Sequence, residues 1–123
     1  MTYQEVANMV ASIGVPYAYY QFPEGTAQPT PFVCFYFDGS NDLFAENTNY
    51  QKIRPLTIEL YTDNKDFTLE ATVESILSSN GFTFARSESW IDSERMNMVV
   101  YTTDVIITSY REDKKMPPQS VAI

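Results

Sequence analysis

The chain has 123 residues, of which 44 % are hydrophobic and 20 % charged, a balance typical of one globular domain with a buried core. Its net charge of −8 argues against non-specific nucleic-acid binding, because the phosphate backbone repels an acidic surface. No apolar run reaches the roughly 18 residues of a membrane helix, and no basic-then-apolar leader opens the chain. We therefore expect a protein made in the cytoplasm, with the single Cys34 as a buried structural thiol.

The first predicted element is a helix that begins at Thr2. Thr2 and Glu5 have the spacing of a capping box, in which each side chain bonds the other residue's backbone N–H. The apolar stripe that follows at helical spacing is Val6, Met9, Val10 and Ile13. Gly14 suits the residue just past the helix end, and the aromatic run from residue 17 to 22 predicts a strand.

Two polar segments surround a second aromatic strand. Residues 23–31 hold three prolines and a glycine and predict a loop, and residues 32–38 predict a strand. Residues 39–49 form a segment too long for a tight hairpin turn, with the apolar Leu43 and Phe44 in its middle. Two interpretations stay open for this pair: a small lid folded on the core, or a contact with a partner.

A strand with two unlike faces follows over residues 50–62. The apolar side is Leu56, Ile58 and Leu60, and the other side is Thr57, Glu59 and Tyr61. Pro55 lacks an N–H, so it requires a sheet edge, a bulge or a strand start. We therefore predict two pieces, 50–54 and 56–62, with a bend between them that offers Lys52 and Arg54 to a neighbour. Ordinary solvated charge is the alternative for these two cations.

The second half predicts one helix and a long hairpin. Asp66 is a suitable N-cap, and the apolar helix residues are Leu69, Val73, Ile76 and Leu77. Glu70 and Glu74 fall on the polar side, Gly81 ends the helix, and residues 82–91 and 96–110 predict two strands. The order α-β-β-β-α-β-β indicates an α+β fold with two helices on one face of a mainly antiparallel sheet. We expect one domain over residues 1–110 and a mobile tail over 111–123.

The sequence lacks the usual catalytic constellations. It has no histidine, one cysteine and no phosphate-binding glycine loop, so we expect no enzyme, no cofactor and no metal site. Asp38, Ser40 and Asp42 resemble the start of a calcium loop, but Leu43 stands where that loop needs glycine and Asn49 where it needs glutamate.

Carboxylates are the remaining chemical candidates. They are Glu59 on the strand and Glu88, Asp92 and Glu94 around Trp90 on the predicted hairpin. Near exposed turns such groups favour solvated or interface charge. A small-ligand module with an acidic pocket is the alternative, since paired carboxylates can perform acid–base chemistry in a closed site.

Four segments together resemble the tail terminator (tail completion) proteins of long-tailed siphophages and their prophage relatives. They are AYYQFPEGTAQPTPFVCFYF, NDLFAENTNYQKIRPLTIELYTDNKD, LEATVESILSSNGF and SESWIDSERMNMVVYTTDV, the second being the most specific. The resemblance covers roughly residues 3–110 and departs in the tail after Tyr110. None of the segments is a catalytic signature.

The resemblance implies a structural virion protein that forms a hexameric ring. Such a ring caps the tail tube, ends tube assembly and forms the surface that joins the head-side connector. It implies self-association and contact with the tail tube protein, no membrane and no sequence-specific nucleic-acid binding. The residues expected at the assembly interface are Leu43, Phe44, Lys52, Arg54, Glu59 and Tyr61. A head-completion or head–tail joining neck protein is the alternative within the virion.

Overall fold

The computed structural model describes residues 1–22, 28–45 and 48–108, with the backbone alone for those between 43 and 51. The helices are α1 (Tyr3–Ala11) and α2 (Phe67–Ser79). The strands are β1 (Tyr17–Tyr19), β2 (Phe32–Phe37), β3 (Leu43–Ala45), β4 (Thr48–Thr62), β5 (Ala85–Ile91) and β6 (Met96–Ile107). The expected tail, 111–123, lies outside the described residues.

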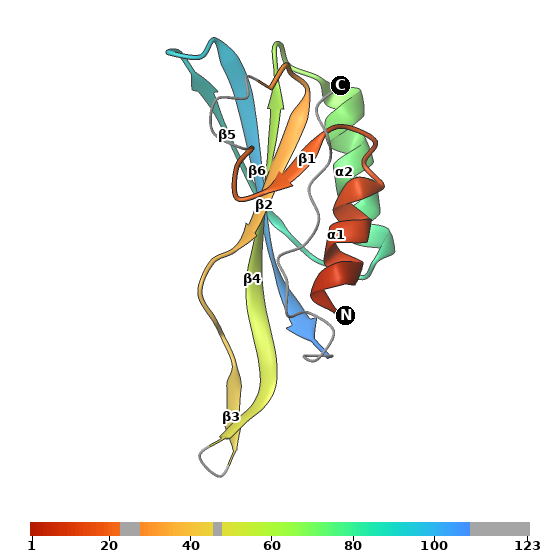
Figure 1. Ribbon diagram of the computed structural model, residues 1–123. Coiled ribbons are helices and arrows are strands. Elements are labelled where there is room, and N and C mark those ends of the chain that lie inside the picture. The colour runs from red at the N-terminus through yellow and green to blue at the C-terminus, as the bar shows by residue number, and fades with distance from the viewer. Residues whose placement is uncertain (23–27, 46–47, 109–123) are drawn as a thin grey trace.

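The fold is α+β, as the sequence predicts, with both helices on the same face of one sheet (Figure 1). The strand order is β1-β2-β4-β6-β5, and β3 pairs only with β4. β1 runs parallel to β2 while the other pairs are antiparallel, so the sheet is mixed. One short strand, β3, is added to the predicted order, inside the segment that the sequence assigns to a loop.

Helix α1 forms as its sequence predicts. The Thr2 hydroxyl accepts the Glu5 N–H at 3.0 Å, and Glu5 Oε1 accepts the Thr2 N–H at 2.8 Å, which completes the capping box. Its apolar stripe is buried in the core, and Gly14 takes the left-handed conformation (φ 91°) just past the helix. That conformation favours glycine, which explains why the chain can turn there into β1.

The prediction for the polar side of α2 is wrong for Glu70. Asp66 caps the helix by accepting the Leu69 N–H at 2.9 Å, as expected. Glu70, however, is only 4 % exposed, because Lys65 Nζ and Arg86 Nη2 contact its Oε1 at 2.7 and 2.5 Å. The carboxylate is buried because two cations from outside the helix neutralise it, a compensation that the periodicity of α2 does not reveal.

The core lies between the helices and the sheet. Leu56, Ile58 and Leu60 of β4 are at most 2 % exposed and pack in the cluster that also contains Phe35 and Tyr101. Full burial of one such aliphatic side chain contributes roughly 1.5–3 kcal/mol. The predicted apolar face of β4 is thus confirmed, and it assigns the alternate residues of β4 to the opposite face of the sheet.

The predicted bend at Pro55 is wrong, since β4 is one strand of 15 residues that pairs with β6 on both sides of the proline. The Pro55 carbonyl accepts the Asp38 N–H at 3.0 Å, so its nitrogen also faces the β2 side. The ladder between β2 and β4 ends at Leu56, and β3 pairs with β4 only at Thr48, Asn49 and Gln51. Pro55 therefore lies between these two ladders. The proline therefore sits at a local edge inside a central strand, where no ladder bond is lost.

Candidate functional site

A hairpin arm projects from the domain beyond the helices (Figure 1). We define the arm as β3 and residues 48–54 of β4. It contains Leu43 and Phe44, whose side chains lie outside the described part of the structure. At its base Lys52 pairs with Ile107 of β6, so the arm continues the main sheet.

An ion pair fixes the base of the arm. Asp42, whose side chain is 1 % exposed, accepts from Arg54 Nη1 and from the Ile53 N–H, the latter at 2.9 Å. Burial alone would raise the pKa of Asp42, but the bonds from Ile53, Ser40 and Arg54 outweigh it and hold the pKa below its ordinary value. The predicted interface residue Arg54 is thus engaged by its own chain and is 15 % exposed.

The opposite side of the sheet ends in β5, an edge strand with exposed side chains over nearly its whole length. In an antiparallel ladder, successive residues point their N–H and C=O groups toward opposite neighbouring strands. The Pro55 carbonyl faces β2, so the backbone groups of Thr102 on β6 face β5. Those of its partner Ala85 on β5 then face β6. The N–H and C=O groups of Arg86, Glu88 and Trp90 then face outward. We call this row the β5 edge. It has no proline and no bulge, two of the features that protect a free edge, while Arg86 and Glu88 place charges on it.

The face of the sheet that points away from the helices, here called the open face, contains two of the predicted residues. Glu59 accepts the Tyr61 hydroxyl at 2.8 Å and the Tyr36 hydroxyl at 3.1 Å. The Tyr61 ring stacks on Phe32, with 4.7 Å between centroids and 17° between planes. The polar face of β4 therefore forms an aromatic cluster around one carboxylate.

The titrating groups beside Glu59 are held neutral. Burial, followed by the hydrogen bond to Glu59, raises the pKa of Tyr61. Burial, followed by the charge of Glu59, raises the pKa of Cys34 to about 11. Cys34 is 6 % exposed and stays a thiol at neutral pH, so the predicted structural role is confirmed and a nucleophilic one is disfavoured.

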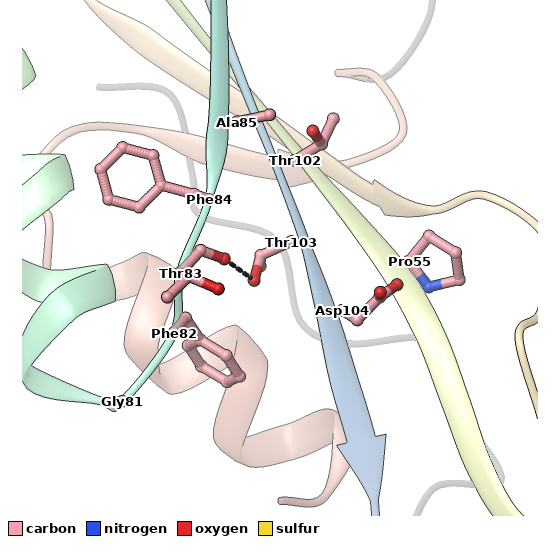
Figure 2. Close-up of a pocket in the computed structure, with 9 residues that line it drawn as sticks. All are labelled: Pro55, Gly81, Phe82, Thr83, Phe84, Ala85, Thr102, Thr103 and Asp104. Atoms are coloured by element: carbon pink, nitrogen blue, oxygen red, sulfur yellow. Dashed lines mark hydrogen bonds between the residues drawn. The ribbon is translucent and has the colours of Figure 1, made fainter.

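A hollow of about 630 Å³ lies where β6 continues past the start of β5 (Figure 2). The Thr103 hydroxyl donates to the Thr83 carbonyl at 2.6 Å across it, and Asp104 faces Pro55 (Figure 2). Asp104 is the one carboxylate in its lining and already accepts the Asn41 amide at 3.2 Å. The hollow therefore shows no set of groups suited to acid–base or nucleophilic chemistry.

The structure brings two of the four predicted carboxylates to one hollow and places the other two elsewhere. Glu59 and Glu94 line a second hollow on the open face, while Glu88 faces the helix side and contacts Lys65 at 2.8 Å. Asp92 lies in the turn between β5 and β6. Within the described residues, no group of three or more His, Cys, Asp or Glu is arranged to hold a metal ion. No helix in those ranges is long and apolar enough to cross a membrane.

The six predicted interface residues thus fall into two groups. Leu43, Phe44, Lys52 and Arg54 belong to the arm, whereas Glu59 and Tyr61 contact each other on the open face. Sequence reasoning missed the β5 edge, because the order of strands in the sheet is not readable from local pattern. It also missed the role of Asp42, which it tested only as a calcium ligand.

Comparisons with known proteins identify a similar fold. No family model matches the sequence, and no curated protein matches it either. Among solved structures, the chain is similar to one from the "virion of native gene transfer agent (GTA) particle", with a TM-score of 0.52 and 16 % identity. The match covers 80 % of this chain and 84 % of that one, so the likeness extends over most of the fold and not over one motif.

Proposed function

We propose that this chain is a virion structural protein that caps a phage tail tube as a ring, ends tube assembly and joins the head. The observation that carries the proposal is the pair of unlike surfaces at opposite sides of one sheet, the arm and the β5 edge (Figure 1). A ring requires a heterologous interface, in which one patch meets a different patch on the next copy. An edge strand without proline or bulge, as β5 is over Ala85–Ile91, supplies backbone donors and acceptors for such a contact.

The fold match supports a virion structural protein, and the resemblance in sequence supports the finer role of a tail terminator. The four segments quoted above resemble tail terminators, and the chain of similar fold comes from a virion. The protein then acts by contact and not by turnover. Six copies, the number that the resemblance implies, would have a mass of about 85 kDa for a chain of 14.1 kDa.

A mass measurement on two matched variants tests the ring contact. Trp90→Pro removes an outward N–H from the β5 edge. Trp90→Ala keeps that N–H and removes only the indole of Trp90, a residue that is 51 % exposed. We expect native mass spectrometry to detect the ring for the unchanged chain and for Trp90→Ala, and monomers for Trp90→Pro. Rings from both variants would contradict a contact through the β5 edge.

Disruption of the gene in a phage that encodes this chain tests the role itself. A missing terminator should give tubes of irregular, excessive length and heads without joined tails, visible by electron microscopy. Free tails of normal length beside DNA-filled heads would instead assign the chain to head completion. Normal virions would end the proposal.

A further inference from the structure

The second hollow, on the open face, has a volume of about 580 Å³ and lies where the chain after β1 crosses β2 and β4. Tyr20 takes a left-handed conformation (φ 72°) and stacks on Tyr36, with 5.2 Å between ring centroids. Phe22 then meets Phe32 edge to face at 5.6 Å. The lining residues that carry the argument are Phe22, Gln28, Phe32, Glu59, Tyr61 and Glu94.

The charged groups among the lining residues of this hollow are both carboxylates. Glu59 and Glu94 contribute carboxylates, and no basic side chain is among the lining residues. The Gln28 Oε1 atom is buried and has no hydrogen-bond partner in the structure. Tyr61 and Tyr36 donate their hydroxyls to Glu59, which orients the carboxylate without neutralising its charge.

Glu59 differs in this respect from Asp42 and Glu70, the two buried carboxylates of the described residues. Asp42 is paired with Arg54, and Glu70 with Lys65 and Arg86. Across residues 1–22, 28–45 and 48–108, Glu59 forms no ion pair, although it is only partly exposed. A partly desolvated carboxylate gains free energy when an opposite charge approaches, so the hollow is electrostatically complementary to a cation.

The walls favour a planar cation over a compact one. The Phe22, Phe32 and Tyr61 rings line the hollow beside the carboxylate. A guanidinium group stacks on aromatic faces and bonds carboxylates at the same time, whereas an ammonium group is a strongly hydrated point charge. We infer that the hollow on the open face binds an arginine side chain presented by another protein chain of the assembly.

No cation of residues 1–22, 28–45 and 48–108 is among the residues that line the hollow. Arg54, Lys65 and Arg86 are engaged in the ion pairs described above. Arg95 follows Glu94 in the β5–β6 turn, but it is exposed and forms no ion pair within the described residues. Because the site uses side chains of a single copy, its binding can be measured whether or not the ring proposed above forms.

An NMR titration of the isolated chain tests the inference. The probes are N-acetyl-arginine methylamide and N-acetyl-citrulline methylamide, which have nearly the same shape but differ in charge. We expect the arginine probe, in the millimolar range, to shift the resonances of Tyr61, Ile91 and Met96, and the citrulline probe to leave them almost unchanged. Higher salt should weaken the effect, because it screens the charges.

Two variants locate the binding, and one controls for general acidity. Glu59→Gln should weaken binding by at least about tenfold, since it replaces a charged acceptor by a neutral one. Glu94→Gln, in an exposed turn, should weaken it less and does not threaten the fold. Asp104→Asn removes a carboxylate from the other hollow and should leave binding unchanged.

Three outcomes would overturn the inference. The first is equal shifts from both probes, and the second is binding that persists unchanged in the Glu59 and Glu94 variants. The third is binding that appears only after Arg95→Gln, since the hollow would then belong to the chain's own arginine. A chain that forms no ring but binds the arginine probe would contradict the proposed ring and leave this inference standing.

Discussion

For Pro55, the rule that proline needs a position without a ladder bond holds, but the bend that we expected from it is absent. The missing N–H demands a position without a ladder bond, and that demand is met. Pro55 lies between the ladder with β2 and the ladder with β3, where its nitrogen has no strand partner. β4 can therefore run through this position without a bend. The sequence supplies the requirement but not the neighbouring strands that satisfy it.

A substitution pair tests this local edge. Pro55→Val adds an N–H that faces the space beside Asp38 and should change the free energy of unfolding by less than about 1 kcal/mol. Thr57→Pro, two residues along the same strand, removes an N–H that faces β2 opposite Tyr36 and should cost about 3 kcal/mol or more. Urea unfolding followed by circular dichroism measures both. Similar losses in the two variants would contradict the local edge.

The caps and apolar stripes were predictable because they depend on residues within one helical turn of each other. Thr2 with Glu5, and Asp66 with Leu69, form the bonds that their spacing predicts. Glu70 was not predictable in the same way. Its burial depends on Arg86, 16 residues away on β5, and no local pattern connects the two.

At the scale of elements, the arm is the feature that local sequence describes least well. β3 has three residues, too few for a periodic signal, and its segment reads as a polar loop. Its partner strand is long and was predicted, but β4 alone does not reveal what pairs with its first residues. The apolar Leu43 and Phe44 were the available signal, and the structure places them in β3.

The arm's attachment can be tested at its base. Asp42→Ala removes the acceptor of the Ile53 N–H and the partner of Arg54. We expect hydrogen–deuterium exchange at the Ile53 amide to accelerate by about tenfold or more, while the amides of the core strands keep their protection. Ser40→Ala removes an Arg54 contact at 3.2 Å and an acceptor of the Asp42 N–H at 3.4 Å, but it keeps the Asp42 carboxylate and should have a smaller effect. Unchanged Ile53 exchange in Asp42→Ala would show that the ion pair does not hold the arm.

At the scale of the whole molecule, stability depends on pH because some carboxylates have different pKa values in the folded and unfolded chain. Hydrogen bonds to the charged form lower the pKa of Glu5 and Glu88: at Glu5 chiefly from the Thr2 backbone, and at Glu88 chiefly from Lys65. A lowered pKa in the folded state stabilises the fold above the ordinary glutamate value of 4.5. That contribution is lost as pH falls through the folded-state pKa.

The prediction for this dependence uses Glu88→Gln. The variant should be less stable than the unchanged chain at neutral pH, and the difference should shrink toward zero as the pH falls below 4.5. Urea midpoints measured at several pH values give this difference. Glu94→Gln, at a turn residue with no ion pair in the described ranges, serves as the control and should differ little at either pH. A Glu88 difference that does not change with pH would contradict the prediction.

The fold class and the two helices of the described residues could be predicted from the sequence, whereas the β5 edge and the aromatic hollow could not. Alternating β4 residues predicted a buried and an unburied face, and Leu56, Ile58 and Leu60 confirm the buried one. The β5 edge exists only because β6 pairs with β4 on its other side, a long-range choice of neighbours. Likewise, the aromatic hollow needs Phe32, Tyr61 and Met96 from three strands.

The uninterrupted course of β4 has a mechanical consequence. The strand that shapes the arm also supplies Leu56, Ile58 and Leu60 to the core, and Lys52 and Arg54 pair with β6 without a bulge. The arm is therefore continuous with a core strand, and β4 has no break that could act as a hinge. A force on the free end of the arm would be transmitted along β4 to the hydrophobic core. A partner that binds the arm only in its folded form would therefore stabilise the whole fold.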